Sequence, residues 1–492
     1  MSRVGLARTE PSYGGITPPF HSAVAYPELR ALFGSEVPLS TTNPAYAGVR
    51  GVLAGLGLDA GRFGTPDWNP LRDLVPAGGR VVLKPNFIRH WNPSPRGSVE
   101  SVITHGSILR AASDYAFLAV GPEGTVEIAE APQQDCDFSA IRRITGLDAV
   151  VELHASHRRH LVVIDLRRET AKFEDGIIVS RTALAGDPRG YRNVDLGRAS
   201  FFEGSGLDPH RFRGADYDPG PTSEHHLDGH NQYLLSETVL SADLVLNLPK
   251  LKTHKKTGVT LALKNLVGIN GDKNWLPHHT LGRPEDGGDE IPSGTWIDLA
   301  RSRLIERARP LLQRGAFTRL FRAARRMETS VRGEEFTRSG NWHGNRTTWR
   351  MCLDLNRCLY YSNAKGLHLD ASGPIRTVLS ILDGIVAGES SGPLSPDDVP
   401  LGVVLAATDP VALDLVALRL MGFDAHRIPK VWQAIADPGP RITSVRDPSE
   451  VEVTEVDTDS FSFTSASLDD IRSPHPFVPH AGWRAHIEGS VS

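Results

Sequence analysis

A strand–loop–helix–strand unit near residue 100 limits the folds that this chain can adopt. Residues 80–84 (RVVLK) have the apolar, β-branched character of a buried strand. Apolar residues then recur with a helical period over about 105–120, and Gly121-Pro122 ends that helix. Residues 125–129 (TVEIA) form a second strand. Because a helical connection joins parallel strands, we predict an α/β fold, with a mostly parallel or mixed sheet flanked by helices.

The remaining sequence extends this sheet. Further strands are predicted at 161–166, 176–180, 243–248 and 401–406, and a helix at 232–241. Asp409-Pro410 and Gly422 are typical of the first and last residues of another helix. We divide the chain into a flexible N-terminal arm (1–19), an α/β region (20–295), an Arg-rich helical insertion (296–338), and the C-terminal part of the same α/β domain (339–492).

The Arg-rich insertion has ten arginines between Arg301 and Arg332 and an apolar stripe. This pattern favours a solvated helical cover. Peripheral membrane contact through 301–332 is a second interpretation, and binding of nucleic acid or a protein partner is a third. The net charge of −4 argues against nucleic acid as a partner. No stretch reaches the ~20 apolar residues of a membrane span, and no signal peptide is recognisable, so we expect a soluble, cytoplasmic protein.

The densest group of polar residues lies at 247–279. Strand 243–248 leads into a predicted loop with Lys250, Lys252 and His254, and Thr257-Gly258 then opens a helix over about 259–267. Amide donors at a helix start and several lysines favour the binding of an anion. Lys264 lies in an apolar run within that helix, where a lysine is either snorkelling or functional.

Polar residues at other element ends are candidates for the same site. Lys84 follows three apolar strand residues, and the carboxyl ends of parallel strands are where open α/β sheets bind ligands. His105 would begin a helix and stay neutral there, which suits a base. Asp383 and Glu389 lie in a glycine-rich run and could orient a hydroxyl group or a metal. Asp414, on an apolar helix face, needs a partner such as a site lysine.

No cofactor is assigned from the sequence. Two histidine clusters, at 225–230 and 278–279, lack the HExxH or CxxC spacing of common metal sites. A divalent metal bound through Asp or Glu oxygens is compatible with the chain. The three cysteines are too few and too scattered for a four-cysteine iron–sulfur cluster.

These residues also carry a family resemblance. The stretch ADLVLNLPKLKTHKKTGVTLALKNLVGINGDK (242–273) resembles the signature of the domain-of-unknown-function family numbered 362. VVLKPN (81–86), DGIVAGESSGP (383–393) and ATDPVALD (407–414) follow the expected order, so the resemblance spans most of the chain. It implies a bacterial or archaeal α/β protein with no settled activity, related to proteins encoded beside glycan or secondary-metabolite genes. The positions to which it points are Lys84, Asn86, Lys250, Lys252, His254, Lys264 and Asn265.

We therefore predict an enzyme of bacterial glycan or secondary metabolism that acts on an anionic small molecule bearing phosphate or carboxylate. The reaction type stays open between transferase, lyase and isomerase. The predicted catalytic residues are His254, Lys264, His105 and Glu389. The predicted substrate-binding residues are Lys84, Asn86, Lys250, Lys252, Thr253, Asn265, Asn270, Lys273 and Asp383. The alternative is a non-catalytic protein that binds an anionic glycan or nucleotide, either in solution or at the membrane surface.

Overall fold

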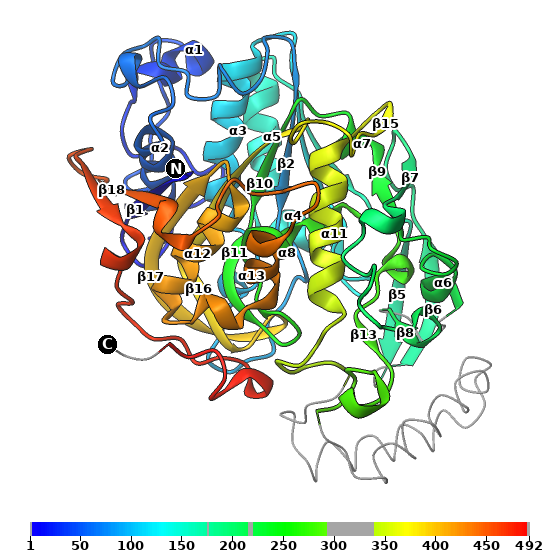
Figure 1. The fold of residues 1–492 in the computed structure, drawn as a ribbon. Helices are drawn as coiled ribbons and strands as arrows, with labels where there is room; N and C mark the ends of the chain where they lie inside the picture. The colour runs from blue at the N-terminus through cyan, green and yellow to red at the C-terminus, as the bar shows by residue number, and fades with distance from the viewer. Residues whose placement is uncertain (1, 175–176, 215–219, 293–338, 490–492) are drawn as a thin grey trace.

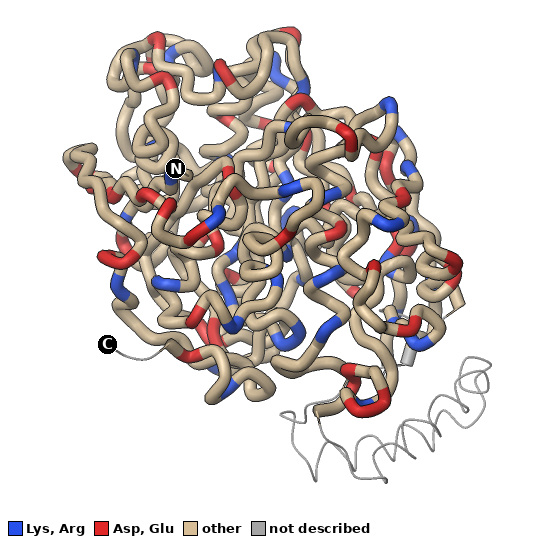
Figure 2. Tube along the Cα trace, in the orientation of Figure 1, with Lys and Arg blue, Asp and Glu red and all other residues tan. Residues whose placement is uncertain are grey.

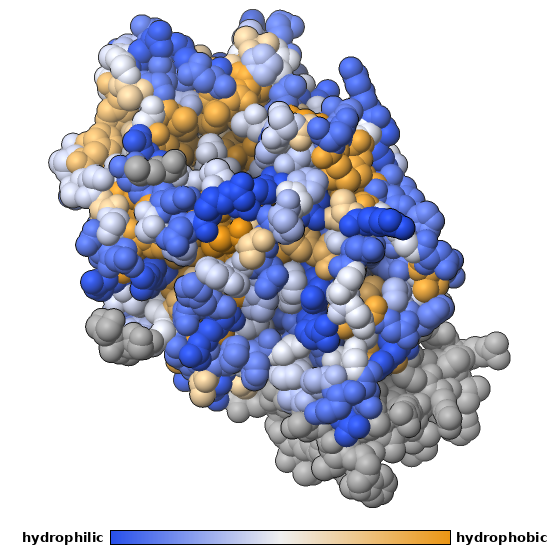
Figure 3. Space-filling view, in the orientation of Figure 1, coloured by the Kyte–Doolittle hydropathy of each residue, from blue (hydrophilic) through white to orange (hydrophobic). Residues whose placement is uncertain are grey.

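A computed structural model describes residues 2–174, 177–214, 220–292 and 339–489 (Figure 1). The predicted Arg-rich insertion at 296–338, with its proposed membrane contact through 301–332, lies outside these residues. None of the helices in the described ranges is both long enough and apolar enough to cross a membrane. In Figure 3 the face toward the viewer is mainly hydrophilic, with smaller apolar patches between the polar residues.

One large mixed sheet organises the molecule, as predicted for an α/β fold. Its parallel part runs, in spatial order, through β16 (Thr377–Ser391), β10 (Leu244–Leu248), β2 (Arg80–Pro85), β3 (Thr125–Glu130) and β4 (Leu161–Asp165). On the other side of β16 the order continues through β17 (Ser395–Ala407), β1 (Ser2–Arg8), β18 (Val451–Asp457) and β19 (Phe463–Ser467). The pairs β16–β17, β1–β17 and β18–β19 are antiparallel, and β1–β18 is parallel.

Helices cover both faces of the sheet, because successive strand residues point to opposite sides. Val81 and Leu83 belong to the core under α2 (Pro44–Gly55) and α3 (Gly106–Val120). Val82, between them, belongs to the opposite core, with the helices α8 (Leu261–Asn265), α11 (Thr348–Tyr361) and α12 (Pro410–Met421). In Figure 1 these two groups are blue to cyan and green to orange, respectively.

Smaller elements surround this framework. The remaining helices are α1 (Arg30–Phe33), α4 (Phe138–Ile144), α5 (Leu147–Ser156), α6 (Gly220–Glu224), α7 (Glu237–Leu240) and α13 (Pro429–Ala436). The remaining strands are β5 (Glu169–Glu174), β6 (Ile177–Ala183), β7 (Tyr191–Asp195), β8 (Phe212–Arg213), β9 (Gln232–Ser236), β11 (Lys250–His254), β12 (Gly258–Val259), β13 (His279–Thr280), β14 (Ser362–Asn363) and β15 (Gly366–Leu367).

The flexible arm predicted at 1–19 is wrong for its first half. β1 lies inside the large sheet, where Leu6 pairs with Leu405 of β17 and with Glu455 of β18. A Cβ added at Gly5 would lie 2.7 Å from the carbonyl oxygen of Val52, so α2 packs tightly on this strand. Partners some 400 residues away in the sequence fix β1, and local composition does not reveal them.

Two further elements differ from prediction for the same reason. The helix expected at 232–241 is β9 followed by the short α7, because β9 pairs with β7. The loop expected after residue 248 is β11, which pairs with β16. By contrast, α3 and α12 match their predicted bounds, with His105 and Asp409 as N-caps and Gly422 in the left-handed region at φ 74°.

Candidate functional site

The candidate site lies at the carboxyl ends of β2 and β10. Lys84 and Asn247 are register partners on these two strands. Val82 and Val245, two residues earlier, belong to the core on the α8 side, so Lys84 and Asn247 also face α8. Figure 2 shows blue Lys and Arg positions along the β11–α8 segment in the middle of the molecule. This edge of a parallel sheet is where α/β proteins bind ligands.

A network of buried amides and lysines joins four of the predicted residues. The Asn265 side chain donates from Nδ2 to Asn247 Oδ1 at 2.8 Å. Its Oδ1 accepts from Asn86 Nδ2 at 2.8 Å and from Lys84 Nζ at 3.3 Å. Asn86 Oδ1 in turn accepts from Lys252 Nζ at 2.8 Å. Residues far apart in the sequence thus form one polar centre beneath α8.

Glu130, at the end of β3, is the counter-charge of Lys84. Its Oε2 lies 2.5 Å from Lys84 Nζ, and both side chains are buried. Burial lowers the pKa of Lys84 and raises that of Glu130, and the attraction between the two charges opposes both shifts. A Cβ at Gly268 would lie 1.7 Å from Glu130 Oε1, so only glycine fits above the pair. The sequence prediction missed Glu130, although it ends a strand beside that of Lys84.

Lys250, Asp383 and His105 belong to a second hydrogen-bonded network, which also includes Tyr13. Lys250 Nζ lies 3.0 Å from Asp383 Oδ2 and donates to the Tyr13 hydroxyl at 2.7 Å. Tyr13 donates to Asp383 Oδ1 at 2.6 Å, and the backbone N–H of His105 donates to Asp383 Oδ2 at 2.9 Å. Burial lowers the pKa of His105 to about 4, so its imidazole is neutral, as predicted. Tyr13 was missed because residues 1–19 were assigned to an arm.

Lys264 is the exception among the buried lysines. Lys84, Lys250 and Lys430 each lie within 3.0 Å of a carboxylate oxygen, on Glu130, Asp383 and Asp414 respectively. The Lys264 side chain makes no hydrogen bond or ion pair in the described part of the chain, although the residue is only 9% exposed. The Nζ atom of Lys264 is not fully enclosed by the protein, so it borders open space. Burial lowers its pKa.

The start of α8 is occupied from within the protein. The backbone N–H groups of Ala262 and Leu263 donate to the Asp414 carboxylate at 2.7 and 3.5 Å. The same carboxylate accepts from Lys430 Nζ at 2.7 Å. The prediction that these N–H groups bind a substrate anion is therefore wrong. Asp414 does pair with a lysine, but with Lys430 in place of a site lysine.

Histidines and further lysines complete the basic surroundings of Lys264. His254 accepts from the backbone N–H of Lys256 at 3.1 Å, and burial and the charge of Lys264 hold its pKa well below the usual value. Burial and the same charge lower the pKa of His278 to about 3. Burial lowers the pKa values of Lys256 and Lys273 to about 7. Two neutral imidazoles therefore lie among lysines that titrate near neutral pH.

Three predicted residues make hydrogen bonds in the described structure, but none of these bonds reaches the polar centre around Asn265. Thr253 donates to the carbonyl oxygen of Ser390 at 3.0 Å, which fastens β11 to β16. Glu389 accepts from the backbone N–H of Val478 at 2.8 Å and lies beside His475, so it holds the C-terminal segment. Its predicted catalytic role has no support in this geometry. Asn270 accepts from the N–H of Asp272 at 3.0 Å, and its buried Nδ2 has no partner.

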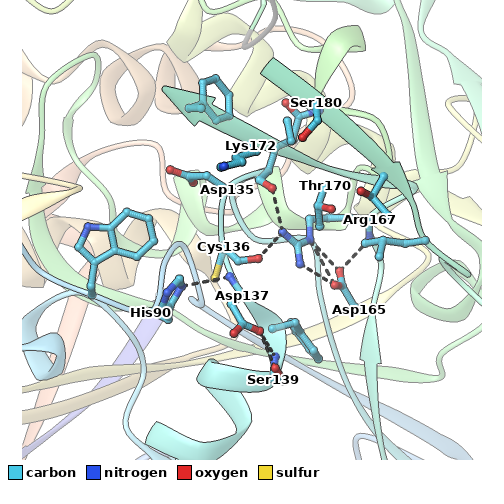
Figure 4. Close-up of a pocket in the computed structure, with 17 residues that line it drawn as sticks. His90, Asp135, Cys136, Asp137, Ser139, Asp165, Arg167, Thr170, Lys172 and Ser180 are labelled. Atoms are coloured by element: carbon cyan, nitrogen blue, oxygen red, sulfur yellow. Dashed lines mark hydrogen bonds and ion pairs between the residues drawn. The ribbon is translucent and has the colours of Figure 1, made fainter. Parts of the chain in front are cut away.

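A cavity of about 770 Å³ opens at the carboxyl ends of β3 and β4 (Figure 4). Arg167 lines this cavity and is held by Asp165 Oδ2 at 2.7 Å. None of the predicted site residues is among the residues that line it. Burial raises the pKa of Cys136 to about 12, so this thiol is a poor nucleophile. Aromatic walls include Trp91 and Phe138.

Among the described residues, no group of three or more His, Cys, Asp or Glu side chains could hold a metal ion. The clustered histidines have other partners: His226 lies 3.0 Å from the carbonyl oxygen of Trp275, and His230 lies 2.5 Å from Asp195 Oδ2. Cys136, Cys352 and Cys358 are buried and free.

The distribution of lysine along the chain is a sequence signal that could have located the site more closely. The chain has only ten lysines among its 54 Lys and Arg residues. Seven of the ten are in or beside this site: Lys84, Lys250, Lys252, Lys255, Lys256, Lys264 and Lys273. Lysine can lose its proton on burial, whereas arginine keeps its charge. A chain that otherwise prefers arginine thus concentrates its titratable cations here.

Comparison with known proteins agrees with the predicted resemblance. Residues 193–419 match the family described as Domain of unknown function (DUF362). The thylakoid-associated protein sll1697 of Synechocystis sp. (strain ATCC 27184 / PCC 6803 / Kazusa) is 26% identical over 218 residues, which cover 44% of this chain and 43% of that protein. No solved structure was found to match. The matched region includes β10, β11, α8, β16 and most of α12, whereas Lys84, Asn86 and Glu130 precede it. Residues 193–419, somewhat less than half of the chain, are thus similar to the DUF362 family of domains of unknown function.

Proposed function

We propose that this protein is an enzyme that binds a small anionic molecule, bearing phosphate or carboxylate, among the lysines of the β11–α8 segment. The observation that carries the proposal is unbalanced buried charge. Lys252 is fully buried, and it has no carboxylate within ion-pair distance in the described ranges. Burying a cation without a counter-charge is costly, and a bound anion would offset that cost.

The neighbouring groups would divide the work. Lys252, Lys256 and Lys273 attract the anion, and the neutral His254 accepts a proton from the substrate. A transferase, lyase or isomerase reaction would use such groups in this way. Together with the family resemblance, this leads us to propose a role in bacterial glycan or secondary metabolism.

Lys252→Met should weaken the binding of inorganic phosphate about 10- to 100-fold, because a hydrogen bond to a charged group contributes about 1.5–3 kcal/mol. The measurement is the rise in melting temperature with phosphate, at constant ionic strength. The unliganded variant should be at least as stable as the wild type, since an unpaired buried cation is removed. Lys365→Met, at an exposed lysine outside the site, is the matched control and should respond like the wild type. Equal phosphate responses in all three proteins would refute the proposal.

The affinity for phosphate should fall as the pH rises above 7. Lys256 and Lys273 have pKa values of about 7 in the folded protein, against an ordinary value of 10.5. Above pH 7 these two lysines lose protons in the empty site, and they must regain them to bind an anion. Phosphate binding therefore takes up protons, and the affinity falls by up to about tenfold per pH unit for each proton taken up. Calorimetry at pH 8 in buffers of different ionisation enthalpy measures that uptake. A pH-independent affinity with no proton uptake would exclude these lysines from the binding site.

The same shifts predict the stability of the empty protein. Between pH 7 and about 10.5 the unfolded chain holds more protons on these lysines than the folded protein does. These lysines therefore make the free energy of unfolding increase as the pH rises across this window and decrease as the pH falls toward 7.

A further inference from the structure

We propose that Lys264 forms an imine with the substrate, and that the substrate is an anionic aldehyde or ketone. This inference rests on the proposed anion site and adds the chemical class of the molecule that occupies it. It also assigns to Lys264 a covalent role that the other lysines of the site do not share.

The first argument is the contrast between Lys264 and the other buried lysines. An amine attacks a carbonyl carbon through its lone pair, so the nitrogen must be unprotonated and not engaged by an acceptor. Lys84, Lys250 and Lys430 each contact a carboxylate, which favours the ammonium form. Lys252 donates to Asn86 Oδ1 and to the carbonyl oxygen of Val102. Lys264 alone among these five lysines has neither kind of partner in the described structure.

The second argument is the position of Lys264. It lies on a helix whose first N–H groups are held by Asp414, and Asn356 of α11 donates to the carbonyl oxygen of Leu263 at 2.8 Å. These contacts fix the backbone that carries the amine. Leu263 and Leu266 around it are buried, so the amine is poorly hydrated, and its pKa is lowered accordingly. A rigid, desolvated amine that borders open space is the arrangement that a lysine nucleophile needs.

The third argument is the presence of neutral bases beside the amine. Burial is the largest cause of the lowered pKa values of His254 and His278, and the charge of Lys264 is the next, so both imidazoles lie within electrostatic range of this lysine. Either imidazole can accept a proton from the attacking nitrogen and return it to the departing oxygen. Lys252, Lys256 and Lys273 meanwhile bind the anionic group and hold the carbonyl in place.

The step balances without any further reactant. The lone pair of Lys264 Nζ forms a bond to the carbonyl carbon, and the π electrons of the C=O bond move to its oxygen. A proton passes from nitrogen to that oxygen through His254, which gives a carbinolamine. His254 then takes the remaining proton from the nitrogen and delivers it to the hydroxyl group, which leaves as water, so the imine forms and the imidazole is neutral again. Hydrolysis reverses these steps and regenerates the free lysine.

The test uses pyridoxal 5′-phosphate, an aldehyde with a phosphate group, followed by borohydride reduction and peptide mapping of the full chain. We expect one equivalent of label, mostly on Lys264, and protection by inorganic phosphate. Pyridoxal, which lacks the phosphate, should label at least tenfold more slowly. Lys264→Arg keeps a cation at this position and should abolish the label, whereas Lys365→Met should leave it unchanged.

The outcomes separate the imine from the anion site. Label spread over the exposed Lys172 and Lys365, with no preference for Lys264 and no loss in Lys264→Arg, would overturn the imine. If phosphate still raises the melting temperature of the wild type in that case, the anion site stands alone. If phosphate also has no effect, both proposals fail. Circular dichroism of Lys264→Arg guards against unfolding, and Lys264→Met provides a second variant if the arginine does not fit.

Discussion

Asp414→Ala should lower the free energy of unfolding by about 3–5 kcal/mol, which is the range for removing one partner of a buried ion pair. The substitution leaves Lys430 buried without its carboxylate at 2.7 Å. It also removes the acceptor of the two N–H groups at the start of α8. Both losses occur in a fully buried setting, where water cannot replace the missing partner. Urea denaturation of the full chain, followed by tryptophan fluorescence, measures the change.

Two variants make this result specific. Asp469→Asn removes a carboxylate that pairs with Arg419 at the surface, and should leave the denaturation midpoint unchanged. Asp414→Asn combined with Lys430→Met removes both charges and should recover most of the stability that Asp414→Ala loses. A loss below about 1 kcal/mol for Asp414→Ala would show that α8 does not depend on this carboxylate.

Glu130→Gln should also destabilise the protein by several kcal/mol, because Lys84 loses its counter-charge without gaining access to water. The lysine can respond by losing its proton, and deprotonating a lysine of ordinary pKa at pH 7 costs about 4–5 kcal/mol. This cost is the upper limit of the destabilisation that we expect from Glu130→Gln. The pKa of Lys84 in the folded variant falls further below its unfolded value, so the destabilisation should grow as the pH decreases. Urea denaturation at pH 6 and pH 9 measures the difference.

Glu127→Gln is the matched control on the same strand. Glu127 is also buried, but its partners Arg80 and Arg189 have side chains 28% and 32% exposed, so water can hydrate them when the carboxylate is removed. We expect a clearly smaller loss than for Glu130→Gln. Equal losses, or no pH dependence for Glu130→Gln, would contradict the assignment of Lys84 as a charge that depends on Glu130.

Local patterns in the sequence were sufficient to predict much of the fold. β2, β3, β10, α3 and α12 appear close to their predicted bounds, because their apolar periodicity and end residues are local signals. β1, β9 and β11 were missed, since each is a strand by virtue of partners distant in the sequence. Helix or loop was the natural interpretation of their composition.

The candidate site was predicted in part for the same reason. Lys84, Asn86, Lys252 and Asn265 could be proposed as one group because each follows or ends a recognisable element, and the structure joins them by hydrogen bonds. What the sequence cannot reveal is which carboxylate neutralises which lysine. Glu130, Asp383 and Asp414 satisfy three of the lysines, and that pairing depends on the tertiary fold. Lys264 was predicted from the sequence to be catalytic, but its contrast with these paired lysines is visible only in the structure.

The central place of β1 has a consequence for the synthesis of this protein. Both neighbours of the strand, β17 and β18, are translated some 400 residues after it. Asp383 likewise follows its partner Lys250 by more than a hundred codons. The nascent chain must therefore carry an unpaired strand and an unneutralised lysine until β16, β17 and β18 have been translated. We expect such a chain to engage holding chaperones during translation and to complete its sheet only after β18 has been translated.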